Sequence, residues 1–293
     1  MTFSMCGFRS VDGSPGATPL YRRWICSFLV LLVATAGVCL AGASRVQAAE
    51  EDDKPELRVM SYNIHHGRGS DDQVDLQRIA AVIKAAQPDL VALQEVDNGV
   101  GRSGGVDQTA ELARLTGMQG RFFKQIDYDG GEYGQAILSK TPLQTPEIIW
   151  LPGEPERERR IVGRAQTTIH GVTFWFATTH LHHANSAIRQ DQAKALNQRF
   201  THGDAPMILA GDFNAPPEAP SIARLQKRWT LATSDAPLLT FPADKPRKQL
   251  DYVVFCPQSA FRCRGAEVVA ERVASDHAPL VVKITSEVKL NEN

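Results

Sequence analysis

Apolar runs that end in polar residues recur along the chain after its first 56 residues. Residues 57–64 and 89–96 are rich in apolar side chains over the length of a strand, which predicts two buried β-strands. Between them, residues 75–87 repeat apolar side chains three and four positions apart, the spacing of one helix face. Pro88 ends this helix, because proline cannot continue it. The pattern therefore predicts a strand, helix, strand unit.

A second unit of the same kind follows later in the chain. Its strand, helix and strand occupy residues 172–181, 187–200 and 206–209. In the first unit, Asn63 and Glu95 are 32 positions apart. In the second, His180 and Asp212 are also 32 positions apart. Equal spacing is common among such units, but polar groups at all four strand ends indicate two related half-domains.

Further short apolar runs predict that strands outnumber helices. These runs are residues 135–138, 161–168, 250–255, 266–269 and 280–284. Such a count favours two sheets packed face to face with helices outside. We expect one domain over residues 57–285, followed by a tail over residues 286–293.

The first 48 residues have the anatomy of a signal peptide. Arg22 and Arg23 precede an apolar run over residues 24–40, and small residues follow. Cleavage is expected after Ala48, with Ala43 as the alternative, leaving residues 49–56 as a charged linker. The apolar run has 17 residues, the short limit for a bilayer span, so an uncleaved membrane anchor is the minority alternative. The protein is therefore expected in the periplasm or outside the cell.

Charge and cysteine content narrow the classes of function. Four of the 32 basic residues and one of the 33 acidic residues lie in the leader, so the chain beyond the leader is mildly acidic. Tight sequence-independent DNA binding usually needs a basic surplus, so a nuclease would rely on local patches and bound metal.

Cys256 and Cys263 lie beyond the leader. In an oxidising compartment a disulfide between them is favoured over two buried thiols, and they make a poor zinc site.

Six polar strings stand just after apolar strands. They are SYNIHHG (61–67), LQEVD (93–97), THLHH (179–183), GDFN (211–214), QLDYV (249–253) and SDHAP (275–279). Any one of these residues is more often a turn, a helix cap or a solvated side chain. Because strand ends gather at one edge of a sheet, six such strings together predict one converging site.

Hydrolysis of a phosphoester would use these residue types. The oxygens of Glu95, Asn63 and Asp276 suit a hard cation such as Mg²⁺ or Mn²⁺, which offsets charge on phosphoryl oxygens. His277 with Asp251 forms a pair that can activate water. Asp212 is the competing candidate for the base. His180 and Asn214 are expected to donate hydrogen bonds to the phosphate, joined electrostatically by Arg164.

Histidines and one arginine are further candidates for substrate contact. His65, His182 and His183 are expected to line the cleft and touch substrate. The alternative is that the histidine-rich strings bind a softer or second metal, such as Mn²⁺ or Zn²⁺. Arg102 lies with Ser103 and Gln108 in a glycine-rich loop after Glu95. One interpretation is that it binds a second phosphate or a head group of the substrate, and the alternative is a solvated loop arginine.

The ordered set of strings resembles the endonuclease/exonuclease/phosphatase superfamily, which includes DNase I, abasic-site endonucleases, inositol-polyphosphate phosphatases and neutral sphingomyelinases. The resemblance covers about residues 57–284. The positions that match family motifs are Asn63, Glu95, His180, Asp212, Asn214, Asp251, Asp276 and His277. Arg164 and the segment 133–140, which starts at Tyr133, also resemble family segments.

The resemblance implies a four-layer α/β sandwich with Mg²⁺ on Glu95 and water activation by His277. It implies that the substrate is a phospholipid head group, a soluble phosphodiester or a nucleic acid, and Tyr133 is taken as a substrate contact. His65 and His182 stand where abasic-site endonucleases and many other members have acids, which favours the general hydrolase branch. An extracellular nuclease and a non-catalytic binding module are the alternatives. We expect a monomer without a protein partner.

Overall fold

The structure is a computed structural model that describes residues 54–154, 158–200 and 205–288. The predicted signal peptide, residues 49–53 of the linker and the last five residues lie outside this range. Within the described ranges, no helix is both long and apolar enough to cross a membrane.

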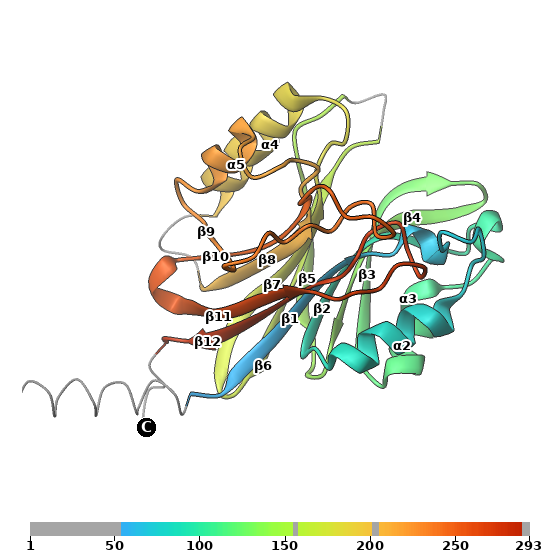
Figure 1. The fold of residues 1–293 in the computed structure, drawn as a ribbon, viewed down its shortest axis with the longest axis horizontal. Helices are drawn as coiled ribbons and strands as arrows, with labels where there is room; N and C mark the ends of the chain where they lie inside the picture. Colours follow the sequence, from blue (N-terminus) through green and yellow to red (C-terminus); the bar gives the residue numbers. More distant parts are fainter. Residues whose placement is uncertain (1–53, 155–157, 201–204, 289–293) are drawn as a thin grey trace, which may run out of the picture. The chain divides into compact units, whose positions relative to one another are not determined.

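Two mixed six-stranded sheets form the centre of the domain (Figure 1). The first contains, in spatial order, β11 (Phe261–Val268), β12 (Leu280–Ser286), β1 (Glu56–Asn63), β2 (Leu90–Asn98), β4 (Gly131–Ser139) and β3 (Gln119–Tyr128). The second contains β5 (Gln144–Trp150), β6 (Ile161–Ile169), β7 (Val172–His180), β8 (Met207–Asp212), β10 (Asp251–Cys256) and β9 (Thr230–Leu231).

The two sheets repeat one arrangement of strands. In the first, β1 and β2 form the parallel central pair, and in the second, β7 and β8 do. All other neighbouring strands are antiparallel. Each parallel pair is one of the strand, helix, strand units read from the sequence, so the predicted relation between two half-domains agrees with the topology.

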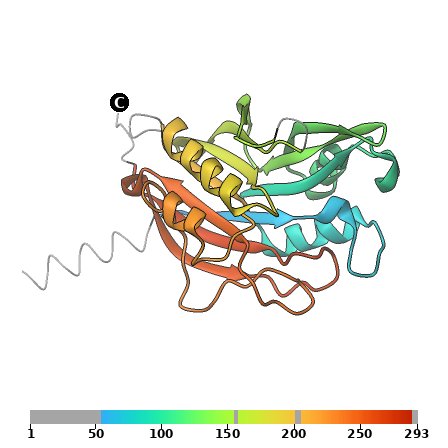
Figure 2. The same ribbon diagram turned by 90° about the horizontal axis from the view of Figure 1, so that it is seen from above.

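Helices cover the outer faces of both sheets, which gives four layers (Figure 1). Seen from above, the helices of residues 186–199 and 220–225 lie side by side (Figure 2). Val59 and Ala92 of the first sheet pack against Phe174 and Ile208 of the second in the core between the sheets. On the outside, α2 (Leu76–Ala86) and α3 (Gln108–Thr116) bury apolar side chains against the first sheet. The helices α4 (Ser186–Arg199) and α5 (Pro220–Leu225) do the same on the second. The predicted four-layer sandwich is confirmed.

Local capping explains where the first two helices begin. The side chain of Asp75 accepts a hydrogen bond from Arg78 N at 3.0 Å, which satisfies one of the unpaired amides at the start of α2. Asp107 does the same for Ala110 N at 2.9 Å, so α3 starts at Gln108. The placement of Gln108 in a loop was therefore wrong, because a short capped helix follows the glycine-rich turn.

The expected disulfide between Cys256 and Cys263 is not formed. Cys256 ends β10 in the second sheet and packs in the core beneath α4 and α5. Cys263 lies in β11 of the first sheet, where its Sγ donates to Thr233 O at 3.7 Å. Because the connection crosses from one sheet to the other, their closeness in sequence does not bring the two thiols together.

Candidate active site

Strand ends from both sheets meet at one edge of the sandwich. The strand β1 ends at Asn63, and its neighbour β2 places Gln94 opposite that residue. In the second sheet, Asp212 pairs in register with His180 on one side and with Asp251 on the other. Gly211 makes this approach possible, because a Cβ there would lie 2.0 Å from Thr179 O. The predicted convergence of the strand-end residues is therefore seen in the structure.

One oxygen of Asp212 lies at the centre of this edge. Its Oδ2 accepts a hydrogen bond from Asn63 Nδ2 at 3.3 Å. The Nε2 atoms of His180 and His277 lie 3.5 and 3.7 Å from the same oxygen. Its Oδ1 accepts from the backbone N–H of Asn214 at 2.8 Å, which fixes the carboxylate plane. The Asp212 carboxylate is thus surrounded by donors from both sheets.

His277 forms a buried pair with Asp251. Its Nδ1 lies 2.8 Å from Asp251 Oδ2, and both side chains are almost fully buried. Burial alone lowers the pKa of His277, but the carboxylates of Asp251 and Asp212 outweigh it and raise that pKa above its usual range. These charges favour the imidazolium form of His277.

Burial shifts the pKa values of the two other titratable groups at the centre, Asp212 and His180, in opposite directions, because it disfavours the charged form of each. Burial raises the pKa of Asp212, and Asp251 and Glu95 add to the effect, against the opposing influence of His277 and the backbone amide of Asn214. Burial, aided by positive charge on Arg160 and His277, holds the pKa of His180 well below its ordinary value. His180 is therefore a neutral imidazole beside a basic carboxylate.

A β-bulge directs Glu95 into this site. The pairing of β2 with β4 shifts between Leu93 and Val96, so the regular alternation of side chains is interrupted. Glu95 adopts a left-handed backbone conformation with φ of 57°. Asn63 Nδ2 donates to Glu95 Oε1 at 2.9 Å, so the same amide links this carboxylate to Asp212.

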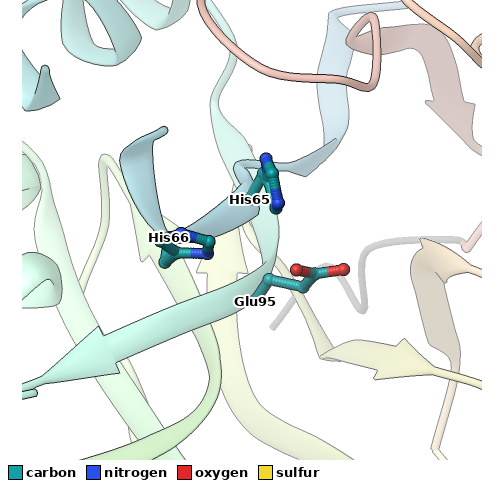
Figure 3. Close-up of side chains that lie close together, drawn as sticks. All are labelled: His65, His66 and Glu95. Atoms are coloured by element: carbon teal, nitrogen blue, oxygen red, sulfur yellow. The ribbon is translucent and has the colours of Figure 1, made fainter. Parts of the chain in front are cut away.

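Two histidines, His65 and His66, lie beside Glu95, which is one of the residues predicted to hold the metal. Figure 3 shows the rings of His65 and His66 beside the carboxylate of Glu95. One ligand atom from each of these three residues lies within 4.8 Å of the other two. Asp276, predicted as a ligand, is partly exposed, with Oδ1 3.9 Å from His65 Nδ1. Asn63 Oδ1 accepts from the backbone N–H of His65 at 3.0 Å, so the amide positions the segment.

Arg102 and Tyr133 lie next to each other near Glu95. The guanidinium of Arg102 makes two hydrogen bonds to the buried carboxylate of Asp97, at 2.9 and 2.8 Å. It also lies over the rings of Tyr128 and Tyr133, 4.6 and 5.5 Å from their centroids. Burial, followed by the charge of Glu95, raises the pKa of Tyr133 well above its usual value, so its hydroxyl stays protonated. Arg102 is thus held by Asp97 and the two tyrosine rings, while its side chain stays partly exposed.

His182 takes a different part from the one predicted. His182 Nδ1 accepts from Ala184 N and Asn185 N at 3.2 and 3.0 Å, which holds the loop before α4. Its neighbour His183 lines a cleft of about 770 Å³ that also contains His277 and Asn214. His183 therefore lines the cleft as expected, whereas His182 does not, because position in a string does not reveal which of two adjacent rings faces the cleft.

Arg164 lies on the outer face of the second sheet, away from these groups. It pairs with Ala177 across β6 and β7, and its guanidinium stacks on Trp175 at 3.9 Å beneath α4. Two hydrogen bonds join it to Glu147 Oε2 at 2.9 and 2.7 Å. The structure therefore does not place Arg164 beside the predicted phosphate site, because its position along β6 directs it outwards.

This placement gives a direct prediction for Arg164. We expect Arg164→Met to lower the free energy of unfolding by about 2 kcal/mol, since a largely buried charge-assisted hydrogen-bond pair is lost. Catalytic turnover should stay within about twofold, because the change removes no site contact. Urea unfolding checks the first value. Arg159→Met is the control, because that side chain covers only the exposed ring of Trp150. Lost turnover at unchanged stability would contradict this assignment.

Comparisons with known proteins agree with this fold. A model of the Endonuclease/Exonuclease/phosphatase family matches residues 60–277. A solved endonuclease/exonuclease/phosphatase from Beutenbergia cavernae DSM 12333 is 24% identical, with TM-score 0.65, covering 79% of this chain and 72% of that chain. The human Nocturnin catalytic domain with bound sulfate anion is 25% identical, with TM-score 0.62, covering 79% and 94%.

A third similar structure is a mannosyl-6-phosphatase from Bacteroides thetaiotaomicron VPI-5482, with 20% identity, TM-score 0.65, and coverage of 78% of this chain and 99% of that chain. No curated protein sequence matched the chain. The family model spans most of the described domain and includes the strand-end residues from Asn63 to His277. The chain therefore belongs to the endonuclease/exonuclease/phosphatase family.

Proposed function

We propose that this protein is an exported, divalent-metal-dependent phosphoester hydrolase. The observation that carries the proposal is the buried Asp212 carboxylate, whose Oδ2 is approached by Asn63, His180 and His277. Glu95 lies beside the same amide of Asn63 and would hold the cation. A bound divalent cation would withdraw negative charge from the phosphoryl oxygens.

The charges of the central groups support a division of roles. A water oxygen would attack phosphorus while the bond to the leaving oxygen breaks, and the water proton would pass to Asp212. Burial makes that carboxylate a stronger base than a solvated one. His277, kept as an imidazolium by Asp251, would donate a hydrogen bond to a phosphoryl oxygen. This differs from the sequence-based assignment of the base to His277.

The cleft beside His277 supports a small phosphoester as the substrate. Its volume is about 770 Å³, and Phe241 and several prolines share the lining with Arg189 and Lys248. A cleft of this size can enclose a molecule of roughly drug size. The cations favour an anionic substrate, and the apolar wall favours a leaving group with carbon surface.

An extracellular nuclease is the second candidate. It is favoured by the cationic part of the cleft lining, which includes Arg189, Arg247 and Lys248. Such a local patch could contact a nucleic-acid backbone even though the chain beyond the leader is mildly acidic. The binding-module alternative is less favoured, because the residues for metal binding and proton transfer are all present.

Hydrolysis assays test the proposal and separate the candidates. The purified full-length protein is assayed with bis-p-nitrophenyl phosphate, p-nitrophenyl phosphate, phospholipid and plasmid DNA, each with Mg²⁺, Mn²⁺ and EDTA. We expect metal-dependent hydrolysis of a small phosphoester that EDTA abolishes. Preferred cleavage of DNA would support the nuclease. No hydrolysis by folded, metal-loaded protein would reject the enzyme and support a binding module.

A further inference from the structure

We propose that the cation held by Glu95 is a first-row transition metal, coordinated also by one ring nitrogen each of His65 and His66. The inference rests on the proposed metal-dependent function but concerns the chemistry of the metal. It assigns His65 and His66 as ligands of that cation. The sequence pattern favours an oxygen-only set for Mg²⁺ or Mn²⁺ and leaves imidazole ligation of a softer or second metal as the alternative.

The three donors already lie close together. Their ligand atoms are within 4.8 Å of one another (Figure 3). A cation about 2.0–2.2 Å from nitrogen and carboxylate donors holds them about 3 Å apart. A bound cation would therefore draw these donors together by no more than about 2 Å.

His66 gives an independent sign of a missing ligand. The residue is 6% exposed, and its Nδ1 is buried without a hydrogen-bond partner. A buried polar nitrogen left unsatisfied costs free energy, so native structures usually provide it with a partner. A metal ion bound at this nitrogen would satisfy it.

The backbone holds both rings in position. Gln108 Nε2 donates to His66 O at 2.7 Å, and Gln108 Oε1 accepts from Asp97 N at 2.9 Å. The side chain of Gln108 therefore ties the histidine segment to β2, the strand that carries Glu95. His65 and His66 have φ of 46° each, and Glu95 has φ of 57°. Left-handed backbone at all three donors is strain of the kind that gathers at functional sites.

The donor set favours one class of cation over another. Mg²⁺ prefers oxygen ligands and retains several waters, whereas imidazole nitrogens suit Zn²⁺ and other first-row transition metals. Nδ1 of His65 faces Asp276 Oδ1 at 3.9 Å, which leaves Nε2 for the metal. A carboxylate behind a metal-bound histidine is a common supporting contact.

Metal titration of the full-length protein tests the inference. After removal of metal by a chelator, Co²⁺ is added and the visible d–d absorption is followed, alone and in competition with Mg²⁺. The test variant carries His65→Asn and His66→Asn, since asparagine tolerates positive φ. The control is His170→Asn, an exposed histidine with φ of 51° in the turn between β6 and β7.

We expect the double variant to lose about 30-fold or more in Co²⁺ affinity. Its Mg²⁺ affinity should change by less than about threefold, because oxygen ligands remain. The control should match the wild type. Equal loss of affinity for both metals, or unchanged Co²⁺ affinity, would overturn the assignment.

A measurement on the wild type covers the case in which the double variant does not fold. Pulsed EPR of the Mn²⁺-loaded protein should show nitrogen hyperfine coupling, and its absence would reject imidazole ligation. The two proposals fail separately. Histidine-dependent Co²⁺ binding without hydrolysis of any phosphoester would reject only the proposed function. Undiminished Mg²⁺-dependent hydrolysis together with unchanged Co²⁺ affinity in the double variant would reject only the histidine ligands.

Discussion

Replacing His277 with glutamine is expected to lower kcat for phosphoester hydrolysis by about a thousandfold. The imidazole is held by Asp251 at 2.8 Å and faces the Asp212 carboxylate. Glutamine keeps a neutral N–H but cannot carry a positive charge. The loss should therefore fall on kcat, measured under saturating substrate and metal.

The pH profile separates this role from a structural one. In the wild type, activity should fall on the acid side as Asp212 takes up a proton, and on the alkaline side as His277 loses one. The alkaline fall follows from the carboxylates of Asp251 and Asp212, which raise the pKa of His277. His277→Gln should lose this alkaline limb and keep the acid one. An unchanged alkaline limb would show that another group titrates there and would reject the assigned role.

Replacing Glu95 with glutamine is the second change with a large expected effect. We expect metal-dependent turnover to fall by about a hundredfold or more, and divalent-metal affinity to fall by more than about tenfold, because the only charged ligand of the three clustered donors is lost. Isothermal titration with Mn²⁺ gives the affinity, and initial rates over a range of metal concentrations give the turnover.

Glu111→Gln is the matched control for Glu95→Gln. Glu111 lies on α3 and pairs with Arg114 three residues along the same helix, so its loss removes the same charge without touching the site. Thermal unfolding should show that both variants fold. If Glu95→Gln retains both metal affinity and turnover, the metal centre lies elsewhere and the proposed site is wrong.

The sequence by itself determined the order of elements and the set of residues that gather at one edge. Continuous apolar runs predicted the strands that became β1, β2, β7 and β8. A strand that lies between two layers is buried on both faces, so most of its side chains are apolar. Two equal spacings of 32 residues predicted the repeat of parallel strand pairs that both sheets show. These features follow from local patterns, which sequence records directly.

Tertiary structure alone decided which way individual side chains face. Arg164 is directed beneath α4 by its position along β6, and two cysteines close in sequence were separated by belonging to different sheets. The bulge in β2 turned Glu95 towards His66, a residue that the sequence offered only as part of a histidine-rich string, with metal binding as the alternative. Bulges, sheet crossings and left-handed residues depend on contacts between distant segments, so no local pattern in the sequence contains them.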